Sequence, residues 1–201
     1  MSYRFSSARR LRGVLIVTTA LSALAGGAFA ASVDHYTVTK NGVTLEISAP
    51  RADIIRVRAG DPNLPEDASW AVSQDVRARH APLDVTEAAG VATVSTGAAS
   101  VKIDETTLAV TVYDKAGHVV LADAKGAALQ FDPDRLGQGF RLRKAMPVDA
   151  HYFGLGDKTG PLDRRNEAFT LWNTDNFGFG VATDPLYKSI PFVLGVDEKG
   201  Q

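Results

Sequence analysis

Apolar and polar residues alternate with a period of two along much of the chain from Tyr36 onward, and this pattern sets the tightest limit on the fold. In residues 43–48 every second side chain is apolar, and shorter versions of the pattern recur at 55–58, 101–104, 108–113 and 140–143. Successive side chains of a β-strand point to opposite faces, so this alternation is typical of strands with one buried face.

Turn sequences separate the alternating segments. Asn41-Gly42 tolerates the positive φ angles of a tight hairpin, and residues 114–117 separate two further apolar runs. No window of a dozen residues shows a capped amphipathic helix, although 68–78 could hold a turn or two. Many short strands joined by close turns predict an all-β fold, an antiparallel β-sandwich.

The first thirty residues have the pattern of an export signal. Arginines come first, an apolar run follows over 13–25, and Ala28-Phe29-Ala30 forms a small-residue exit. We therefore expect a signal peptide over 1–30, cleaved after Ala30, and a periplasmic or secreted domain over 31–201. The apolar run is short for a bilayer, so we expect no permanent membrane span.

Composition excludes several classes of function. The chain has no cysteine, which excludes disulfides, thiolate metal sites and thiol catalysis. Four of its 22 basic residues and none of its 23 acidic residues lie in the first thirty positions, so residues 31–201 are acidic and nucleic acid is an unsuitable partner. The four histidines are far apart and lie beside no carboxylate at ligand spacing, so we expect no metal and no cofactor.

Aromatic residues concentrate in the last quarter of the chain. Residues 151–192 hold eight of the sixteen aromatic side chains, mixed with five glycines and a set of charged and amide residues. Any one of these aromatics fits a core position. Their density favours a carbohydrate site, because sugars need flat aromatic platforms for their C–H faces and polar groups for their hydroxyls.

Three motifs in this region carry a family resemblance: YFGLGDKTGPLDRR at 152–165, LWNTD at 171–175 and DPLYKSIPF at 184–192. In this order they resemble the N-terminal domain of glycoside hydrolase family 31, the α-glucosidase and α-xylosidase family. The resemblance is close over 151–196 and weak before it. It implies a galactose-mutarotase-like super-sandwich, followed in the family by a (β/α)₈ barrel that carries both catalytic aspartates.

The resemblance also implies a role for the second motif. In the family this loop reaches the mouth of the barrel, where Asp175 would hydrogen-bond an α-linked oligosaccharide on its leaving-group side. Asn173 would bond a hydroxyl or close a turn that aims Asp175. Trp172 would stack on a sugar ring, although a Leu-Trp pair at the end of a strand also fits ordinary packing.

Other polar residues of the motifs are expected to brace the loop. Asp157 stands where the family usually has Glu, and Arg164 and Arg165 could clamp a carboxylate of the loop or of the barrel. A catalytic pair of Asp163 and Asp175 is set aside, because spacing in a loop fixes no geometry. Lys158 after Gly-Leu-Gly does not complete a phosphate-binding loop.

These observations assign no catalytic residue to the chain itself. Barrel motifs are absent, so we expect a domain that is incomplete at its C-terminus and needs a barrel in cis for hydrolysis. The alternative is a free-standing exported module that binds sugar or assembles with a partner, without catalysis.

Overall fold

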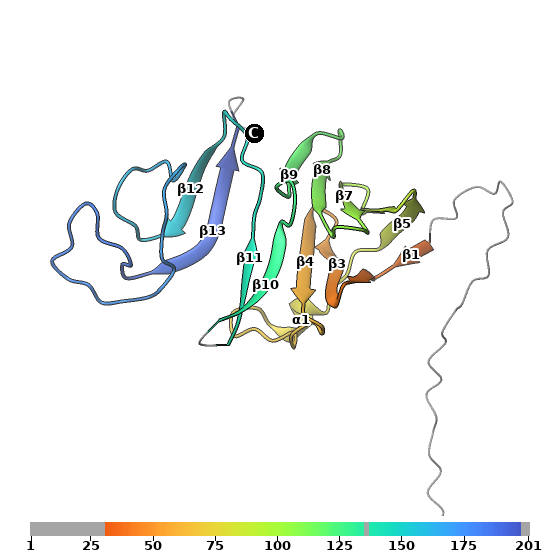
Figure 1. Ribbon diagram of the computed structural model, residues 1–201, viewed down its shortest axis with the longest axis horizontal. Helices are drawn as coiled ribbons and strands as arrows, with labels where there is room; N and C mark the ends of the chain where they lie inside the picture. Colours follow the sequence, from red (N-terminus) through yellow and green to blue (C-terminus); the bar gives the residue numbers. More distant parts are fainter. Residues whose placement is uncertain (1–30, 135–136, 198–201) are drawn as a thin grey trace, which may run out of the picture.

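The computed structural model describes residues 31–134 and 137–197, and these form an antiparallel all-β structure (Figure 1). The predicted signal peptide lies outside the described residues. The single helix in the described part is the one-turn α1 (Gln74–Arg77), inside the segment for which the sequence allowed a turn or two. The expected fold class is therefore confirmed.

Two sheets make up the larger part of the molecule. A six-stranded antiparallel sheet has the order β1-β5-β6-β7-β8-β9, and a three-stranded sheet has the order β2-β3-β4. The six-stranded sheet consists of β1 (Ala31–Val33), β5 (Leu83–Ala88), β6 (Val91–Ser95), β7 (Ala99–Asp104), β8 (Val110–Asp114) and β9 (Val119–Ala122). The three-stranded sheet consists of β2 (His35–Lys40), β3 (Val43–Arg51) and β4 (Ile54–Gly60).

The apolar side chains of the alternating segments at 43–48, 101–104 and 108–113 form the core between these sheets. The other two segments depart from the expected buried face, because Val57 is 42% exposed and Phe140 and Leu142 are 70% and 49% exposed. In β3, Leu45, Ile47 and Ala49 are all at most 2% exposed, and they belong to one buried cluster with residues of β5 to β8. Partner positions continue the apolar rows across the six-stranded sheet, as where Val94 pairs with Val101. The alternation in the sequence therefore corresponds to one face of each sheet turned inward.

The strand expected at 108–113 begins later than the alternation suggested. Leu108 has a φ of 57° and donates its backbone N–H to the carbonyl of Asp104 at 2.7 Å, so it closes the preceding turn. The side chain of Leu108 still packs in the core. Because only its side chain follows the alternating pattern, β8 starts at Val110.

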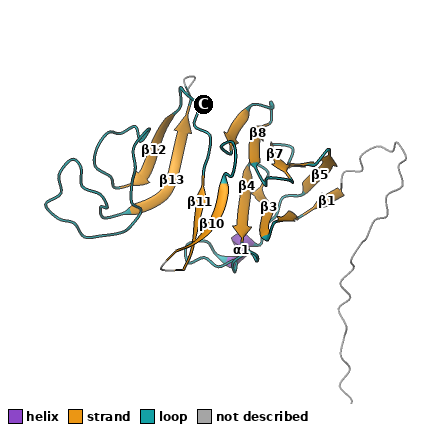
Figure 2. Cartoon of the chain, in the orientation of Figure 1, coloured by secondary structure: helices purple, strands orange, loops and turns teal. Residues whose placement is uncertain are grey.

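Two hairpins follow the sandwich, and Figure 1 shows them to one side of it. β10 (Leu129–Asp134) pairs with β11 (Gly137–Leu142), and β12 (His151–Gly156) pairs with β13 (Ser189–Val196). The chain between β12 and β13 is a long loop (Figure 2). Within the ranges that the structure describes, no helix is long and apolar enough to cross a membrane.

Candidate functional site

The 157–188 loop carries the candidate site residues and connects β12 to β13. Its first and last residues, Asp157 and Lys188, are in direct contact. The backbone N–H of Asp157 donates to the carbonyl of Lys188 at 2.8 Å. The Lys188 ammonium lies 3.4 Å from the Asp157 carboxylate; the Lys188 side chain is largely exposed and that of Asp157 is partly buried. Asp157 therefore lies at the base of the loop, in contact with the residue that ends it.

Lys158 connects two separate parts of the loop with the first residue of β13. Its side chain is fully buried, and its Nζ donates to the Thr170 carbonyl at 2.6 Å, to Asp184 Oδ1 at 3.0 Å and to Ser189 Oγ at 3.4 Å. The other oxygen of Asp184 accepts the backbone N–H of Thr170, and this bond is the main reason why the pKa of Asp184 is lowered. The buried ammonium thus fixes the segment that leads into Leu171.

Asn173 fixes the far side of the same segment. Its Oδ1 accepts the backbone N–H of Ser189, the first residue of β13, at 2.7 Å. This bond spans the loop instead of closing the local turn that the sequence suggested. A cavity of about 380 Å³ lies beside it. The residues that line this cavity are Leu171, Trp172, Asn173, Ser189 and Pro191.

Trp172 and Asp175 are both open to solvent at this place. The Trp172 residue is 69% exposed, so it does not fill the sandwich core. Asp175 is also exposed, and its side chain makes no hydrogen bond or ion pair with any residue of the described ranges. Trp172 and Asp175 therefore present an aromatic plane and an unpaired carboxylate on a segment that is held at the Thr170 backbone and at the Asn173 side chain.

Arg164 and Arg165 bond backbone carbonyls, where the sequence suggested a carboxylate. Arg164 donates to the carbonyl of Thr159 at 3.1 Å and stacks on the Phe169 ring at 5.2 Å. Arg165 donates to the carbonyls of Pro147 and Ala150 at 2.7 and 2.6 Å. Both guanidinium groups thus lie against the loop and the segment that precedes β12.

Asp163 is committed to local hydrogen bonds. One oxygen accepts the backbone N–H groups of Tyr152 and Arg165, and the other lies 2.6 Å from His151 Nδ1. These donors, the Tyr152 N–H first, lower the pKa of Asp163 to about 2. A carboxyl group with that pKa is ionised at neutral pH and holds no proton to donate, so Asp163 is unsuited to general-acid catalysis.

Lys158 and Asp184 are the site residues that sequence reasoning missed. From the sequence, Lys158 suggests only a phosphate-binding loop, which its spacing does not complete, and Asp184 is only the first residue of the third motif. A lysine between glycine-rich and aromatic segments was the available signal, because a cation there needs a buried partner. In the described part of the chain, no three histidine, aspartate or glutamate side chains are grouped closely enough to hold a metal ion.

Comparison with known proteins gives the following matches. The family model of the glycosyl hydrolase 31 N-terminal galactose mutarotase-like domain matches residues 44–201. Alpha-glucosidase 2 of Bacillus thermoamyloliquefaciens is 30% identical over 148 residues, which cover 73% of this chain and 18% of that protein. A probable alpha/beta-glucosidase of Aspergillus clavatus is 38% identical over 89 residues, 43% of this chain and 9% of that protein.

Solved structures share the fold. A GH31 dextranase of Flavobacterium johnsoniae, solved with isomaltotriose, superposes with a TM-score of 0.68 at 24% identity and covers 85% of this chain and 22% of its own. A GH31 alpha-xylosidase of Xanthomonas citri gives a TM-score of 0.63 at 22% identity, covering 81% of this chain and 17% of its own. This chain therefore spans about a fifth of the length of such proteins.

Proposed function

This chain belongs to the glycosyl hydrolase 31 family as its N-terminal galactose mutarotase-like domain, and we propose that it is the substrate-mouth domain of an exported retaining α-glycosidase. In this proposal a (β/α)₈ barrel in cis supplies the catalytic aspartates. The 157–188 loop supplies Trp172, Asn173 and Asp175 to an α-linked oligosaccharide. The relatives named as glucosidases and the dextranase solved with isomaltotriose support this substrate class.

The observation that carries the proposal is the contrast between a fixed backbone and open side chains at residues 170–175. Thr170 and Asn173 are held by bonds to Asp184 and Ser189. Trp172 and Asp175 nevertheless remain exposed. An aromatic face and a carboxylate on a preorganised segment match the C–H face and hydroxyl rim of a sugar, and little ordering entropy is left to be lost on binding.

Two further parts of the proposal rest on other features. The arginines, apolar run and Ala28-Phe29-Ala30 exit of residues 1–30 support export. Retaining glycosidases need two carboxyl groups about 5–5.5 Å apart, one of them protonated. Asp163, which the sequence offered as a possible partner of Asp175 in such a pair, is held ionised. This supports hydrolysis by barrel aspartates and no turnover by this chain alone.

The experiment uses residues 31–201 joined to the barrel-bearing remainder of the Bacillus relative. Asp175→Ala should lower kcat/KM for maltose about ten- to a hundred-fold, because a hydrogen bond to a charged group contributes about 1.5–3 kcal/mol. An aryl α-glucoside places no sugar on the leaving-group side, so its kcat/KM should fall much less. Asp84→Ala, at an exposed carboxylate of β5, is the matched control and should change neither value.

Equal losses of kcat/KM on the two substrates would remove Asp175 from the leaving-group subsite, and so would no loss on either. If the fusion has no activity, the unfused chain is tested for maltotriose binding by calorimetry. Binding that Asp175→Ala weakens then supports the alternative of a free-standing sugar-binding module.

A further inference from the structure

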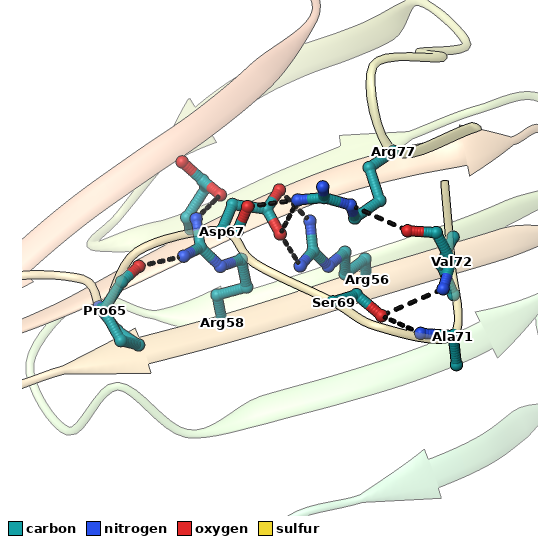
Figure 3. A network of polar contacts seen from close by, with 9 residues as sticks. Arg56, Arg58, Pro65, Asp67, Ser69, Ala71, Val72 and Arg77 are labelled. Carbon is teal, nitrogen blue, oxygen red and sulfur yellow. Dashed lines mark hydrogen bonds and ion pairs between the residues drawn. The ribbon is translucent and has the colours of Figure 1, made fainter. Parts of the chain in front are cut away.

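A second cavity, of about 370 Å³, lies on the face of the β2–β3–β4 sheet that is turned away from the core. The connection from β4 to β5, which includes α1, covers it, and Figure 3 shows the polar network at this place. Its lining is almost wholly polar. The lining residues are His35, Glu46, Ser48, Arg56, Arg58, Asp67, Gln74, Arg77, Ala78 and His80.

The sheet supplies the floor of this cavity through cross-strand partners. In one row His35 of β2 pairs with Ser48 of β3, which pairs with Arg56 of β4. In the next row Glu46 of β3 pairs with Arg58 of β4. Partner side chains of neighbouring strands share a face, so these groups converge on one patch although the sequence separates them. His35 and His80, which are far apart in the sequence, both line this cavity.

Ser48 is the most informative residue of this patch. It is 3% exposed and lines the cavity, yet its hydroxyl has no hydrogen-bond partner among the residues that the structure describes. Its neighbours Ile47 and Ala49 are in the core. The hydroxyl oxygen still reaches solvent through the cavity, because among the described residues the side-chain atom that is both fully buried and without a partner is Arg164 Nε. Ser48 therefore offers a hydroxyl that is open to the cavity and free to bind a ligand.

The charges around Ser48 leave an excess of positive charge. Arg56 makes two bonds to Asp67, at 2.8 and 2.9 Å, and Arg58 bonds Glu46 at 3.1 Å. Arg77 lies 3.6 Å from the already paired Asp67 carboxylate and otherwise donates to the carbonyls of Asp67 and Val72 (Figure 3). The lining thus holds three guanidinium groups against two carboxylates.

The remaining lining groups are uncommitted. In the described part of the chain, the side chains of His35, Gln74 and His80 make no hydrogen bond or ion pair. No aromatic residue other than the histidines lines the cavity. A neutral sugar therefore finds no platform for its C–H face, whereas a compact negative group finds several donors and a surplus of positive charge.

We propose that this cavity binds an oxyanion group, a carboxylate or a phosphate, carried by a small polar ligand. The Ser48 hydroxyl, the Gln74 amide and the free N–H groups of Arg77 are the donors, and the surplus guanidinium charge balances the anion. The site lies on another sheet from the 157–188 loop and does not depend on the function proposed for that loop.

The test measures the melting temperature and the dissociation constant of the purified chain with four probes: inorganic phosphate, glucuronate, glucose, and sodium chloride at matched ionic strength. Phosphate or glucuronate should raise the melting temperature above the chloride value, while glucose should not. A rise with phosphate alone identifies a free inorganic oxyanion, and a rise with glucuronate identifies an acidic sugar. No rise with either probe overturns the proposal.

Two variants make the test specific. Ser48→Ala should weaken binding about tenfold or more, because a hydrogen bond to a charged group is lost. It should not lower the melting temperature without ligand, because the hydroxyl has no protein partner to lose. Arg77→Gln should also weaken binding, whereas Arg51→Gln removes the same charge from a guanidinium that is 70% exposed outside the cavity and should not. Unchanged affinity in Ser48→Ala, or equal losses in both arginine variants, would contradict the site.

Discussion

At the scale of single residues, Lys158 shows how a buried charge orders the 157–188 loop. An ammonium has three donors, and in Lys158 they meet a carbonyl, a carboxylate and a hydroxyl. Burial of the charge is costly, and these three acceptors offset the cost only while the loop keeps its path. The same bonds place Thr170 and Ser189 on the two sides of the segment that exposes Trp172.

Replacing this ammonium should open the loop. Lys158→Met leaves Asp184 without its cation. It should lower the free energy of local opening by about 3–5 kcal/mol, or remove the protection of the loop amides against hydrogen exchange altogether. Hydrogen exchange of the Thr170 and Ser189 amides measures this, because both are bonded across the loop.

The matched control for Lys158 is Lys188→Met, whose ammonium is 74% exposed and pairs with Asp157 at 3.4 Å. An exposed pair of this kind contributes less than about 1 kcal/mol. Equal acceleration of exchange in the two variants would show that Lys158 has no special role in the loop.

At the scale of elements, the β12–β13 hairpin depends on an unusually close approach of its strands. Gly156 has a φ of +82°, and a Cβ there would lie 2.3 Å from the carbonyl oxygen of Lys188 and 2.9 Å from the Ile190 nitrogen. Both contacts are with backbone atoms, which cannot rotate away. The register shift between Gly154 and Gly156 therefore requires a residue without a side chain.

A pair of alanine substitutions separates this contact from ordinary strain. Gly178 has a similar φ of +78° with no atom near its Cβ position, so Gly178→Ala should cost about 1–2 kcal/mol of stability. Gly156→Ala should cost at least about 2 kcal/mol more, because the strands must also move apart. Hydrogen exchange of the Asp157 and Ser189 amides, which are bonded at the base of the loop and across it, reports both values. Similar costs would contradict the argument.

The strands of the sandwich were predictable because a half-buried strand must alternate, as β3 and β7 do. The contacts of the site were not. Lys158 bonds residues between 12 and 31 positions away in the chain, and no local pattern encodes the path of the loop that brings them together. The motif sequence points to Trp172, Asn173 and Asp175 as a group. The hydrogen bond from Ser189 to Asn173 joins residues 16 positions apart, and no sequence pattern predicts it.

At the scale of the whole molecule, buried apolar residues are unevenly distributed. All ten buried members of the core cluster lie between Leu45 and Val110. In residues 137–197, the buried apolar residues are Ala150 and Leu186. Consecutive residues of β13, Phe192, Val193 and Leu194, are 64%, 47% and 53% exposed, so both faces of this strand meet solvent. An isolated two-stranded ribbon of this kind is only marginally stable in water.

This distribution predicts two levels of stability in one chain. Amides of β3, β6 and β7 should exchange only through global unfolding, because opening them exposes the core. Amides of β12 and β13 should exchange through local opening, with protection at least about 100-fold lower. Most of the surface of this hairpin is already in contact with water, so its opening exposes little more. Low concentrations of urea should speed exchange in the first group and leave the second nearly unchanged, since the urea dependence scales with the surface exposed. Hydrogen exchange followed by NMR checks this strand by strand. Equal protection and equal urea dependence in the two groups would mean that the hairpin and the sandwich unfold as one unit, stabilised by contacts other than buried apolar residues.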